Sequence, residues 1–398
     1  MLILVVNCGS SSIKYKLMDM EQETVLLSGL AERIGIAGSR IKQESQAGKE
    51  LVLEQDLPNH KVALETILKC ITDQTYGAIS DISMIKAVGH RVVHGGEEFN
   101  KSVLINDELI KVLEELSDLA PLHNPPNVVG IKTCREILPG IPHVAVFDTA
   151  FHQSIPKHAF MYGIPYQYYE KYKIRKYGFH GTSHKYVSGR AAEILGKSVE
   201  ELKIIVCHLG NGSSITAVGN GVSVDTTMGF TPLAGLPMGT RTGDIDPAIV
   251  TFLMEKENLS IDETNNLLNK QSGVLGISGI SSDFRDLEDA ANQGNERAEL
   301  ALSMFAYSIN KWIGAFTAAL GGLDVVVFTG GIGENSKDMR ARVLKGLAYT
   351  GLEIDEEKNN SRGKEVIISK PGSPITAMVV PTNEELMIAR ETKVLATR

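Results

Sequence analysis

The chain has 398 residues, of which 43% are hydrophobic and 22% charged, and its formal net charge is −8. This length exceeds one ordinary core, so we expect two domains, and the acidic balance argues against a general nucleic-acid binder. Four scattered cysteines without a CxxC pair favour reduced thiols in the cytoplasm, and no apolar run is long enough to predict a membrane span.

The first half of the chain predicts a hairpin followed by alternating strands and helices. We expect the hairpin at residues 1–20 and strands at 24–30 and 51–56, with a polar loop between those two strands. Further expected elements are helices at 59–72, 106–118 and 126–138 and buried strands at 85–93 and 143–147.

The second half predicts another hairpin and more helices. An irregular connection is expected at 162–177, a helix from about residue 183, and a long functional loop at 225–247. Helices are then expected at 246–257, 261–270, 283–293 and 296–320, strands at 324–329 and 376–380, and a final helix from Glu384. The apolar segment 299–320, interrupted by Lys311, is interpreted as a buried or interface helix.

Two stretches in the two halves share one pattern. Residues 2–17 (LILVVNCGSSSIKYKL) and 204–219 (IIVCHLGNGSSITAVG) each combine an apolar run, a Gly/Ser-rich turn and an alternating run. This repeat predicts two similar α/β domains, each with a β-hairpin whose turn leaves backbone N–H groups accessible to phosphate oxygens.

Neither standard nucleotide motif is present. The chain has no Walker A loop, and the GxGxxG pattern at 331–336 is incomplete because its last position is Ser336. Instead, strands lead into small residues at 7–14, 208–212 and 330–335. One such turn is weak evidence, but three favour a nucleotide site.

Several charged or titratable residues are candidates for a catalytic site because of their surroundings in the sequence. Arg91 interrupts an apolar strand and needs an anion, which either a carboxylate partner or a substrate can supply. Arg241 lies on the long loop, and two such arginines suit the charge of a phosphoryl-transfer transition state. Asp148 ends a strand, where it is either catalytic or a helix N-cap. His180 lies near glycines, and its spacing to His184 is a poor basis for a zinc site.

Other polar residues have equally open interpretations. Lys14 either reaches a phosphate or is an ordinary strand lysine. Asp283 is either a nucleotide contact or an N-cap. Glu384 either compensates the dipole of the last helix or contributes to a Mg²⁺ site, since that ion takes few protein ligands.

The motifs NCGSSSIK, GHRVVHGG, APLHNPPN, VFDTAFH, RKYGFHGTSH, CHLGNGSSI, MGFTPLAGLPMGTRTGDIDP, FTGGIGEN and PTNEEL, in this order, resemble those of the acetate kinase family. The resemblance extends from residue 3 to about residue 392. It implies two duplicated ribonuclease-H-like (actin-like ATPase) domains around an ATP cleft. We expect residues 1–150 and 384–398 to form the domain for acetate and metal, and residues 151–383 the domain for nucleotide binding and dimer contact.

The resemblance also implies a reaction, the reversible transfer of a phosphoryl group from ATP to acetate with Mg²⁺ or Mn²⁺, and a homodimer. Its residue roles, carried onto this sequence, are metal binding by Asn7 and Glu384; catalysis by Asp148, Arg91, His180 and Arg241; an acyl pocket of Val93, Leu122, Phe179 and Pro232, beside Arg91; and ATP binding by Lys14, His208, Leu209, Gly210, Asn211, Gly212, Asp283, Phe284, Arg285, Gly331, Ile332, Gly333, Glu334 and Asn335.

Three rival functions are weighed. A sugar kinase would need a polar, hydroxyl-binding pocket and a base with reach, whereas the candidate pocket residues here are apolar. A propionate or butyrate kinase of the same family would need a wider acyl pocket, and the bulk of Val93 favours acetate. An actin-like or chaperone-like ATPase would need a filament surface or an appended peptide-binding domain, whereas this chain ends soon after its second domain and carries two arginines suited to phosphoryl transfer.

Overall fold

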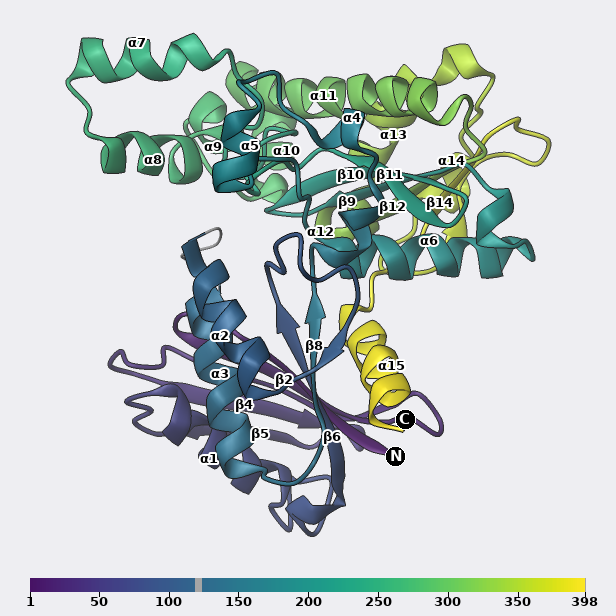
Figure 1. Ribbon diagram of the computed structural model, residues 1–398. Coiled ribbons are helices and arrows are strands. Elements are labelled where there is room, and N and C mark those ends of the chain that lie inside the picture. The colour runs from purple at the N-terminus through teal and green to yellow at the C-terminus, as the bar shows by residue number, and fades with distance from the viewer. Residues whose placement is uncertain (119–123, 398) are drawn as a thin grey trace. The chain divides into compact units, whose positions relative to one another are not determined.

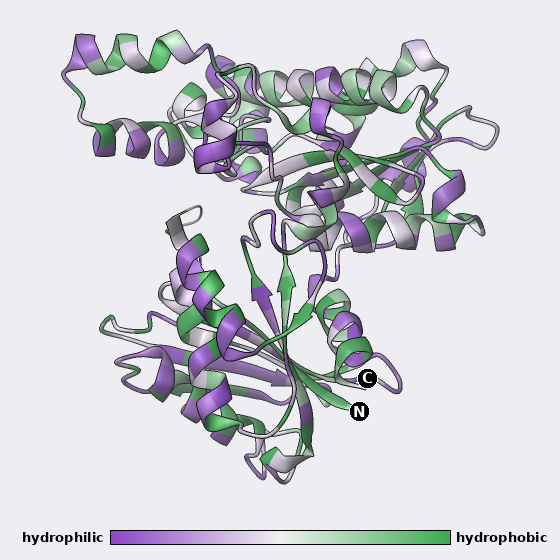
Figure 2. Cartoon of the chain, in the orientation of Figure 1, coloured by the Kyte–Doolittle hydropathy of each residue, from purple (hydrophilic) through white to green (hydrophobic). Residues whose placement is uncertain are grey.

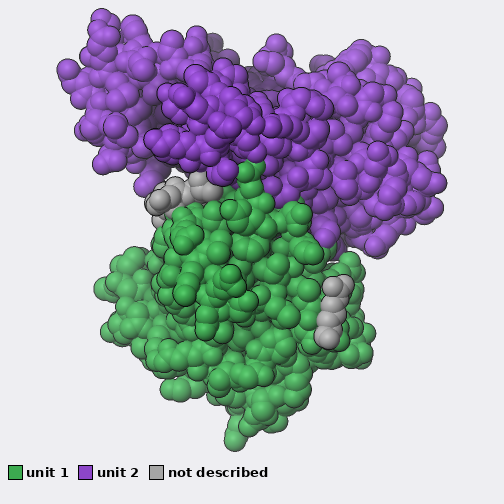
Figure 3. All heavy atoms as spheres, in the orientation of Figure 1, with its two compact units in different colours: residues 1–150, 383–398 green, residues 151–382 purple. Residues whose placement is uncertain are grey.

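The computed structural model describes residues 1–118 and 124–397. The chain divides into two compact units, which Figure 3 distinguishes by colour. Unit 1 comprises Met1–Ala150 and Asn383–Arg398, and unit 2 comprises Phe151–Thr382. Unit 1 is therefore built from two separate stretches of chain, whereas unit 2 is one continuous stretch.

Within the described residues, unit 1 contains an eight-stranded mixed sheet in the order β5-β4-β3-β2-β1-β6-β8-β7. β1, β6 and β8 pair in parallel, and the other pairs are antiparallel. The strands are β1 (Leu2–Cys8), β2 (Ser12–Asp19), β3 (Thr24–Glu32), β4 (Arg40–Ser45), β5 (Glu50–Glu54), β6 (Ile85–Val92), β7 (Val103–Leu104) and β8 (His143–Phe147). Hydrophobic residues dominate the inner strand β8 (Figure 2), every residue of which is buried.

Helices cover both faces of this sheet (Figure 1). α1 (His60–Ile71), α2 (Asp107–Glu115) and α3 (Asn124–Ile137) lie on one face, and α15 (Glu384–Ala396) lies on the other against β1, β6 and β8. Because side chains alternate along a strand, Cys8 and Ile13 enter the core beneath α1 and α3. Asn7 and Lys14 consequently point to the face that carries α15.

Unit 2, within the described residues, contains a six-stranded sheet in the order β11-β10-β9-β12-β14-β13. The strands are β9 (Ile204–Leu209), β10 (Ser213–Gly219), β11 (Val222–Thr226), β12 (Val325–Thr329), β13 (Val366–Ile367) and β14 (Thr376–Val379). The helices are α4 (Lys157–Phe160), α5 (Gln167–Tyr172), α6 (Gly181–Leu195), α7 (Pro247–Glu257), α8 (Ile261–Lys270), α9 (Gly273–Ser278), α10 (Phe284–Asn292), α11 (Glu296–Leu320), α12 (Gly330–Asn335), α13 (Lys337–Gly346) and α14 (Glu356–Asn359).

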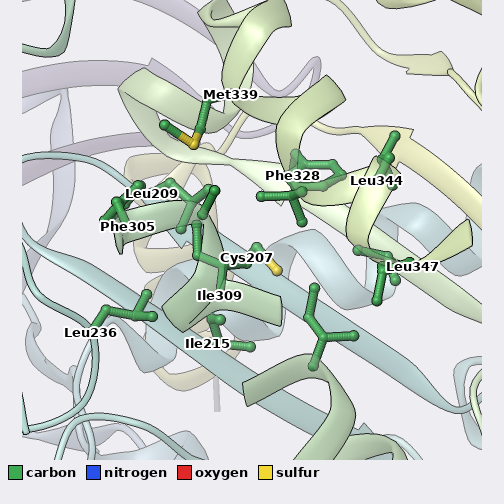
Figure 4. Packing of buried hydrophobic residues seen from close by; sticks show 14 of the residues in the cluster. Cys207, Leu209, Ile215, Leu236, Phe305, Ile309, Phe328, Met339, Leu344 and Leu347 are labelled. Carbon is green, nitrogen blue, oxygen red and sulfur yellow. The ribbon is translucent and has the colours of Figure 1, made fainter. Parts of the chain in front are cut away.

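The larger core of unit 2 lies between this sheet and the long helix α11. Phe305 and Ile309 of α11 pack with Cys207 and Leu209 of β9 and with Phe328 of β12 (Figure 4). Burying such side chains contributes about 1.5–3 kcal/mol each. In the described part of the chain, no helix combines the length and the apolar character needed to cross a membrane.

The two sheets share one topology. The order β3-β2-β1-β6-β8 in unit 1 corresponds to β11-β10-β9-β12-β14 in unit 2, with the same antiparallel and parallel pairings. The two repeated sequences form the equivalent hairpins β1-β2 and β9-β10. The predicted duplicated α/β fold is therefore confirmed.

Three local predictions were wrong. The expected polar loop before β5 contains the strand β4, whose inward-facing Gln43 bonds to Tyr15 Oη at 2.9 Å and to the Cys70 carbonyl at 2.9 Å. A buried polar residue hides the alternation by which strands are recognised. The connection at 162–177 contains the short helix α5. The glycine-rich segment 330–335, expected as a turn, is the helix α12, entered through Gly330 at φ +75°.

Candidate active site

Four of the expected site residues lie on one face of the unit 1 sheet. Asn7 and Lys14 are direct partners across β1 and β2. Arg91 lies on β6, and Glu384 is the first residue of α15, which packs on this face. All four line one cavity of about 450 Å³. Strands β1, β2 and β6 and helix α15 thus present an amide, two cations and a carboxylate to the same space.

Arg91 is held by Asp148. The Arg91 guanidinium donates from Nη2 to Asp148 Oδ2, and Asp148, which follows β8, is 1% exposed. Burial alone would lower the pKa of Arg91, but Asp148 and Glu384 outweigh it, so the pKa is raised. Of the two anions that the sequence left open for Arg91, the carboxylate partner is present here. Arg91 Nε remains buried without a hydrogen-bond partner in the described residues.

Glu384 is the carboxylate best suited to bind a cation. Its Oε2 lies 3.9 Å from Arg91 Nε, and its side chain is 24% exposed. Burial, and next the negative charge of Asp148, raise the pKa of Glu384 to about 7. A divalent cation beside it would lower that pKa, because an opposite charge favours the ionised form. Together with the amide oxygen of Asn7, this donor set fits a hard, oxygen-preferring cation.

Val93 directly follows β6 and is 6% exposed. Its backbone N–H donates to Asn127 Oδ1 at 3.1 Å, and Asn127 Nδ2 donates to the Cys8 carbonyl at 2.8 Å. One amide of α3 therefore links the ends of β1 and β6, next to Asn7 and Arg91. Leu122, expected to line the same pocket, lies outside the described residues.

In unit 2, two cationic or titratable side chains converge on a glycine. A Cβ atom at Gly212 would lie 3.5 Å from Arg241 Nη1 and 3.7 Å from His180 Nε2. His180 precedes α6 and Arg241 lies on the long loop, 61 positions further along the chain. The fold nevertheless places both beside the β9–β10 turn.

His180 is fixed by its backbone and by two neighbours. It precedes α6 in the left-handed conformation, with φ 57°. Its Nδ1 bonds to Ser214 Oγ at 2.9 Å, and its ring stacks on His208 at 4.3 Å. His184 Nε2 bonds to the same Ser214 hydroxyl at 2.7 Å. Within residues 1–118 and 124–397, no group of three or more His, Cys, Asp or Glu side chains forms a metal-binding cluster.

Arg241 is held by neutral groups. Its Nη1 donates to the Pro232 carbonyl at 3.1 Å, and burial lowers its pKa. No carboxylate in the described part of the chain pairs with it, so its charge remains available to an anion. Phe179, the residue before His180, is buried, and its carbonyl bonds to His152 Nε2 at 3.0 Å.

A cavity in unit 2, of about 640 Å³, is lined by many of the residues expected to bind ATP. It is lined by Gly210, Asn211, Ser282, Asp283, Phe284, Arg285, Glu288, Gly331, Ile332, Asn335, Ser336 and Arg362. Asp283 is also the N-cap of α10, and it pairs with Arg285 at 2.6 Å. Both interpretations of Asp283 are therefore compatible with its position.

Some of the expected ATP-binding residues have structural partners instead. Glu334 does not line this cavity, and its Oε1 accepts from the Gly330 N–H at 2.9 Å and the Thr382 N–H at 3.1 Å. His208 Nδ1 bonds to Ser183 Oγ at 2.8 Å. The remaining expected residues that do not line this cavity are Leu209, Gly212 and Gly333 of unit 2 and Lys14, which lines the cavity of unit 1.

Sequence reasoning missed three polar residues that organise these sites, namely Asn127, Ser214 and Glu288. Asn127 and Ser214 are buried, but other polar residues accompany them on α3 and β10, so no sequence pattern singled them out. Glu288 lies four residues after Phe284 on α10, so helical spacing alone would have placed it on the same face.

The duplicated mixed sheets and the anion-directed side chains define a protein of the actin-like ATPase fold. A sequence model of the Acetokinase family matches residues 2–390, and the chain belongs to that family. An acetate kinase of Desulforamulus reducens is 80% identical over 395 residues, covering 99% of this chain and 100% of the relative.

Solved structures agree with this assignment. An acetate kinase from Porphyromonas gingivalis matches with a TM-score of 0.96 at 51% identity, covering 99% of each chain. A propionate kinase from Francisella tularensis matches with a TM-score of 0.92 at 44% identity, again covering 99% of each chain.

Proposed function

We propose that this chain is an acetate kinase, a phosphotransferase with a carboxyl group as acceptor. It transfers the γ-phosphoryl group of ATP reversibly to acetate, giving acetyl phosphate and ADP. The observation that carries this proposal is the 80% identity to an acetate kinase over 99% of the chain. The positions of Arg91, Asp148, His180 and Arg241 support it.

In this proposal, unit 1 binds acetate. Acetate is already ionised at pH 7, since carboxylic acids titrate near pH 4 to 5, so it needs no general base. Arg91 binds the carboxylate, and Asp148 keeps the guanidinium in position through their ion pair. Positioning and charge stabilisation then supply the catalysis of a direct in-line transfer.

Unit 2 supplies the nucleotide site and the charge for the transferring phosphoryl group. Arg241 and His180 are assigned to the equatorial oxygens, because both are held beside Gly212 and Arg241 carries no competing carboxylate. The glycine turn at 210–212 and the start of α12 bind phosphates through backbone N–H groups. Lys14, in unit 1, is assigned as a further phosphate contact.

We assign the divalent cation as Mg²⁺, held by Asn7 and Glu384. The oxygen donors suit this ion, which retains several waters and takes few protein ligands. When bound, the cation supplies charge neutralisation to the phosphates. Mn²⁺ is the alternative ion.

The acyl pocket decides between acetate and longer acids. Val93 is assigned as the residue that limits acyl length, because it is buried and its backbone is fixed by Asn127. The 44% identity to a propionate kinase keeps propionate as the alternative substrate. One methylene in such a pocket changes specificity by only about 1–3 kcal/mol, so propionate should be a poorer but real substrate.

We also propose a homodimer that uses the exposed apolar side chains of unit 2. None of the residues of α7 is buried, and its Phe252 is 57% exposed. Tyr307 and Leu300, also exposed, lie on α11, the helix expected to contribute to the contact. Apolar surface of this kind is typical of protein interfaces. The four cysteines are free and buried, which supports a reducing compartment such as the cytoplasm.

The experiment that tests the reaction is ADP release from ATP and Mg²⁺ with acetate, propionate or butyrate, with hydroxylamine trapping of the acyl phosphate. Acetate-dependent release with trapped acetyl hydroxamate, strongest for acetate, is the expected result. A preference for a longer acid would overturn the substrate, and ATP hydrolysis that ignores carboxylates would overturn the transferase.

A further inference from the structure

The nucleotide cavity of unit 2 has two chemically different ends. At one end, the turn that contains Gly210 lies against Gly331, and a Cβ at Gly210 would lie 4.0 Å from Gly331 N. The Gly210 N–H donates to Ser213 Oγ at 3.2 Å, so Gly331 supplies the backbone N–H group assigned to phosphate at this end. Gly331 is at the start of α12, and Ser336 follows the end of that helix. At 1.5 Å per residue, the two positions are separated by roughly 7 Å along the helix axis. The cavity therefore extends from a phosphate-binding end along α12.

Glu288 lies at the other end. Its Oε1 accepts from Ser336 Oγ, and the Ser336 hydroxyl in turn accepts from the Met339 N–H at 3.0 Å, as the N-cap of α13. This chain of hydrogen bonds fixes the carboxylate before any ligand binds. Glu288 Oε2 has no hydrogen-bond partner among the described residues. A carboxylate here would repel phosphates, but it can accept from neutral donors.

The cations around Glu288 do not form a hydrogen bond with it. Arg342 donates through both Nη atoms to Glu299, at 2.6 and 2.8 Å. Arg362 lines the same cavity and is exposed, and within the described residues it forms no ion pair with Glu288. Asp338, which is also near Glu288, carries the same negative charge and therefore offers it no ion pair. Glu288 also lines a neighbouring cavity beside α13, distinct from the nucleotide cavity, which Asp338 and Arg342 line as well.

From this geometry we propose that Glu288 is a specificity-determining residue that accepts a hydrogen bond from a donor group of the nucleoside. The donor is either a ribose hydroxyl or the exocyclic amino group of adenine, since both present O–H or N–H groups to a carboxylate. This inference rests on the proposed function in assigning the cavity to ATP. A fixed acceptor gains affinity because little conformational freedom is lost on binding.

The test compares ATP with 2′-deoxy-ATP, 3′-deoxy-ATP and inosine triphosphate, each of which lacks one donor. We expect the wild-type protein to discriminate against one of them by roughly 10- to 100-fold in kcat/KM, since a hydrogen bond to a charged group is lost. Glu288→Ala should lower kcat/KM for ATP by a similar factor and abolish that discrimination, with the KM for acetate unchanged. Glu288→Gln, which retains an acceptor oxygen, should recover part of it.

Asp289→Ala is the matched control, because Asp289 is an exposed carboxylate on the same helix and does not line the cavity. It should leave both activity and discrimination unchanged. The proposal is overturned if the wild type treats all four nucleotides alike, or if Glu288→Ala weakens all four equally, which is what a purely structural link to Ser336 would do. It is also overturned if Arg362→Ala reproduces the loss of discrimination, because Glu288 would then act through Arg362.

Binding of ADP, 2′-deoxy-ADP, 3′-deoxy-ADP and inosine diphosphate, measured by calorimetry, gives the same comparison without acetate or turnover. If acetate-dependent turnover is absent but Glu288→Ala still removes the discrimination in binding, only the proposed reaction fails. If turnover is normal and the discrimination in binding is unaffected, only the role of Glu288 fails.

Discussion

We expect the side-chain amide of Asn127 to contribute strongly to the free energy of unfolding, because it satisfies two buried backbone groups at once. It is 3% exposed, and it bonds both the Cys8 carbonyl and the Val93 N–H, just beyond the last paired residues of β1 and β6. Asn127→Ala leaves both buried backbone groups without this partner. Since each unsatisfied buried group costs about 1–3 kcal/mol, we expect a loss of about 2–6 kcal/mol in the free energy of unfolding.

Asn127→Asp makes this reasoning sensitive to pH. The protonated carboxyl group has the shape of the amide and can donate to the Cys8 carbonyl while accepting from Val93, whereas the ionised form cannot donate. Burial will raise the folded-state pKa of the new aspartate above its ordinary value of about 3.9. A raised folded-state pKa contributes stability at low pH that is lost as the pH rises through it. The loss begins above the unfolded-state value of about 3.9, so the Asp variant should be closer to wild-type stability at pH 5 than at pH 8.

Hydrogen exchange of peptides from β1 and β6 measures this effect in unit 1. The fluorescence of Trp312, the single tryptophan, reports on α11 of unit 2. Val129→Ala is the control on the same helix, since Val129 is 46% exposed and surface changes usually stay within about 0.5 kcal/mol. If the difference between the Asp variant and the wild type were the same at pH 5 and pH 8, the hydrogen-bond account of Asn127 would be refuted.

Four further results are expected. Asp148→Asn should lower kcat by roughly 100-fold or more with the fold intact by circular dichroism, because the guanidinium loses its charged partner; retention of most activity would contradict the role. Val93→Ala should raise kcat/KM for propionate relative to acetate by roughly tenfold, and no change would remove Val93 from the acyl pocket. His90 is buried and its pKa is lowered by burial, so its contribution to stability is present above its ordinary value of about 6.5 and lost as the pH falls; thermal melting at pH 7 and pH 5 should show this loss, and His90→Asn should reduce it. Phe252→Glu should yield monomers in size-exclusion chromatography with light scattering, whereas Lys256→Glu, at an exposed position one turn further along α7, should not; dimers in both variants would exclude α7 from the contact.

The parts of the fold that follow hydrophobic periodicity could be predicted from the sequence. The two hairpins, the buried strand β8 and the long helix α11 have continuous or regularly spaced apolar residues. β4 could not be recognised, because its buried Gln43 is stabilised by partners that are distant in sequence. Likewise, α12 begins with two glycines, which favour a turn locally, and the fold around β9 and β12 overrides that preference.

The candidate site likewise combines features that local sequence predicts with features that only tertiary contacts determine. Residue type and neighbours indicated that Arg91 needs an anion, but not that Asp148 supplies it, because that ion pair depends on the neighbouring positions of β6 and β8. Helical spacing from Phe284 could place Glu288 on the same face of α10, but it could not show what the carboxylate contacts. The hydrogen bond from Ser336 that holds the Glu288 carboxylate forms only in the tertiary structure, because the two residues are distant in sequence.

The division of unit 1 into two stretches of chain has a consequence for synthesis. α15 covers the face of β1, β6 and β8 and carries Glu384, yet it follows all of unit 2 in the chain. During translation, unit 2 can therefore bury its sheet as a continuous segment, while one face of the unit 1 sheet stays uncovered until the last helix emerges. Since contacts so distant in sequence form late, the carboxylate proposed to bind the metal reaches its place only at the end of folding. A ribosome stalled before α15 would hold a nascent protein in which unit 2 is complete and unit 1 lacks its last helix.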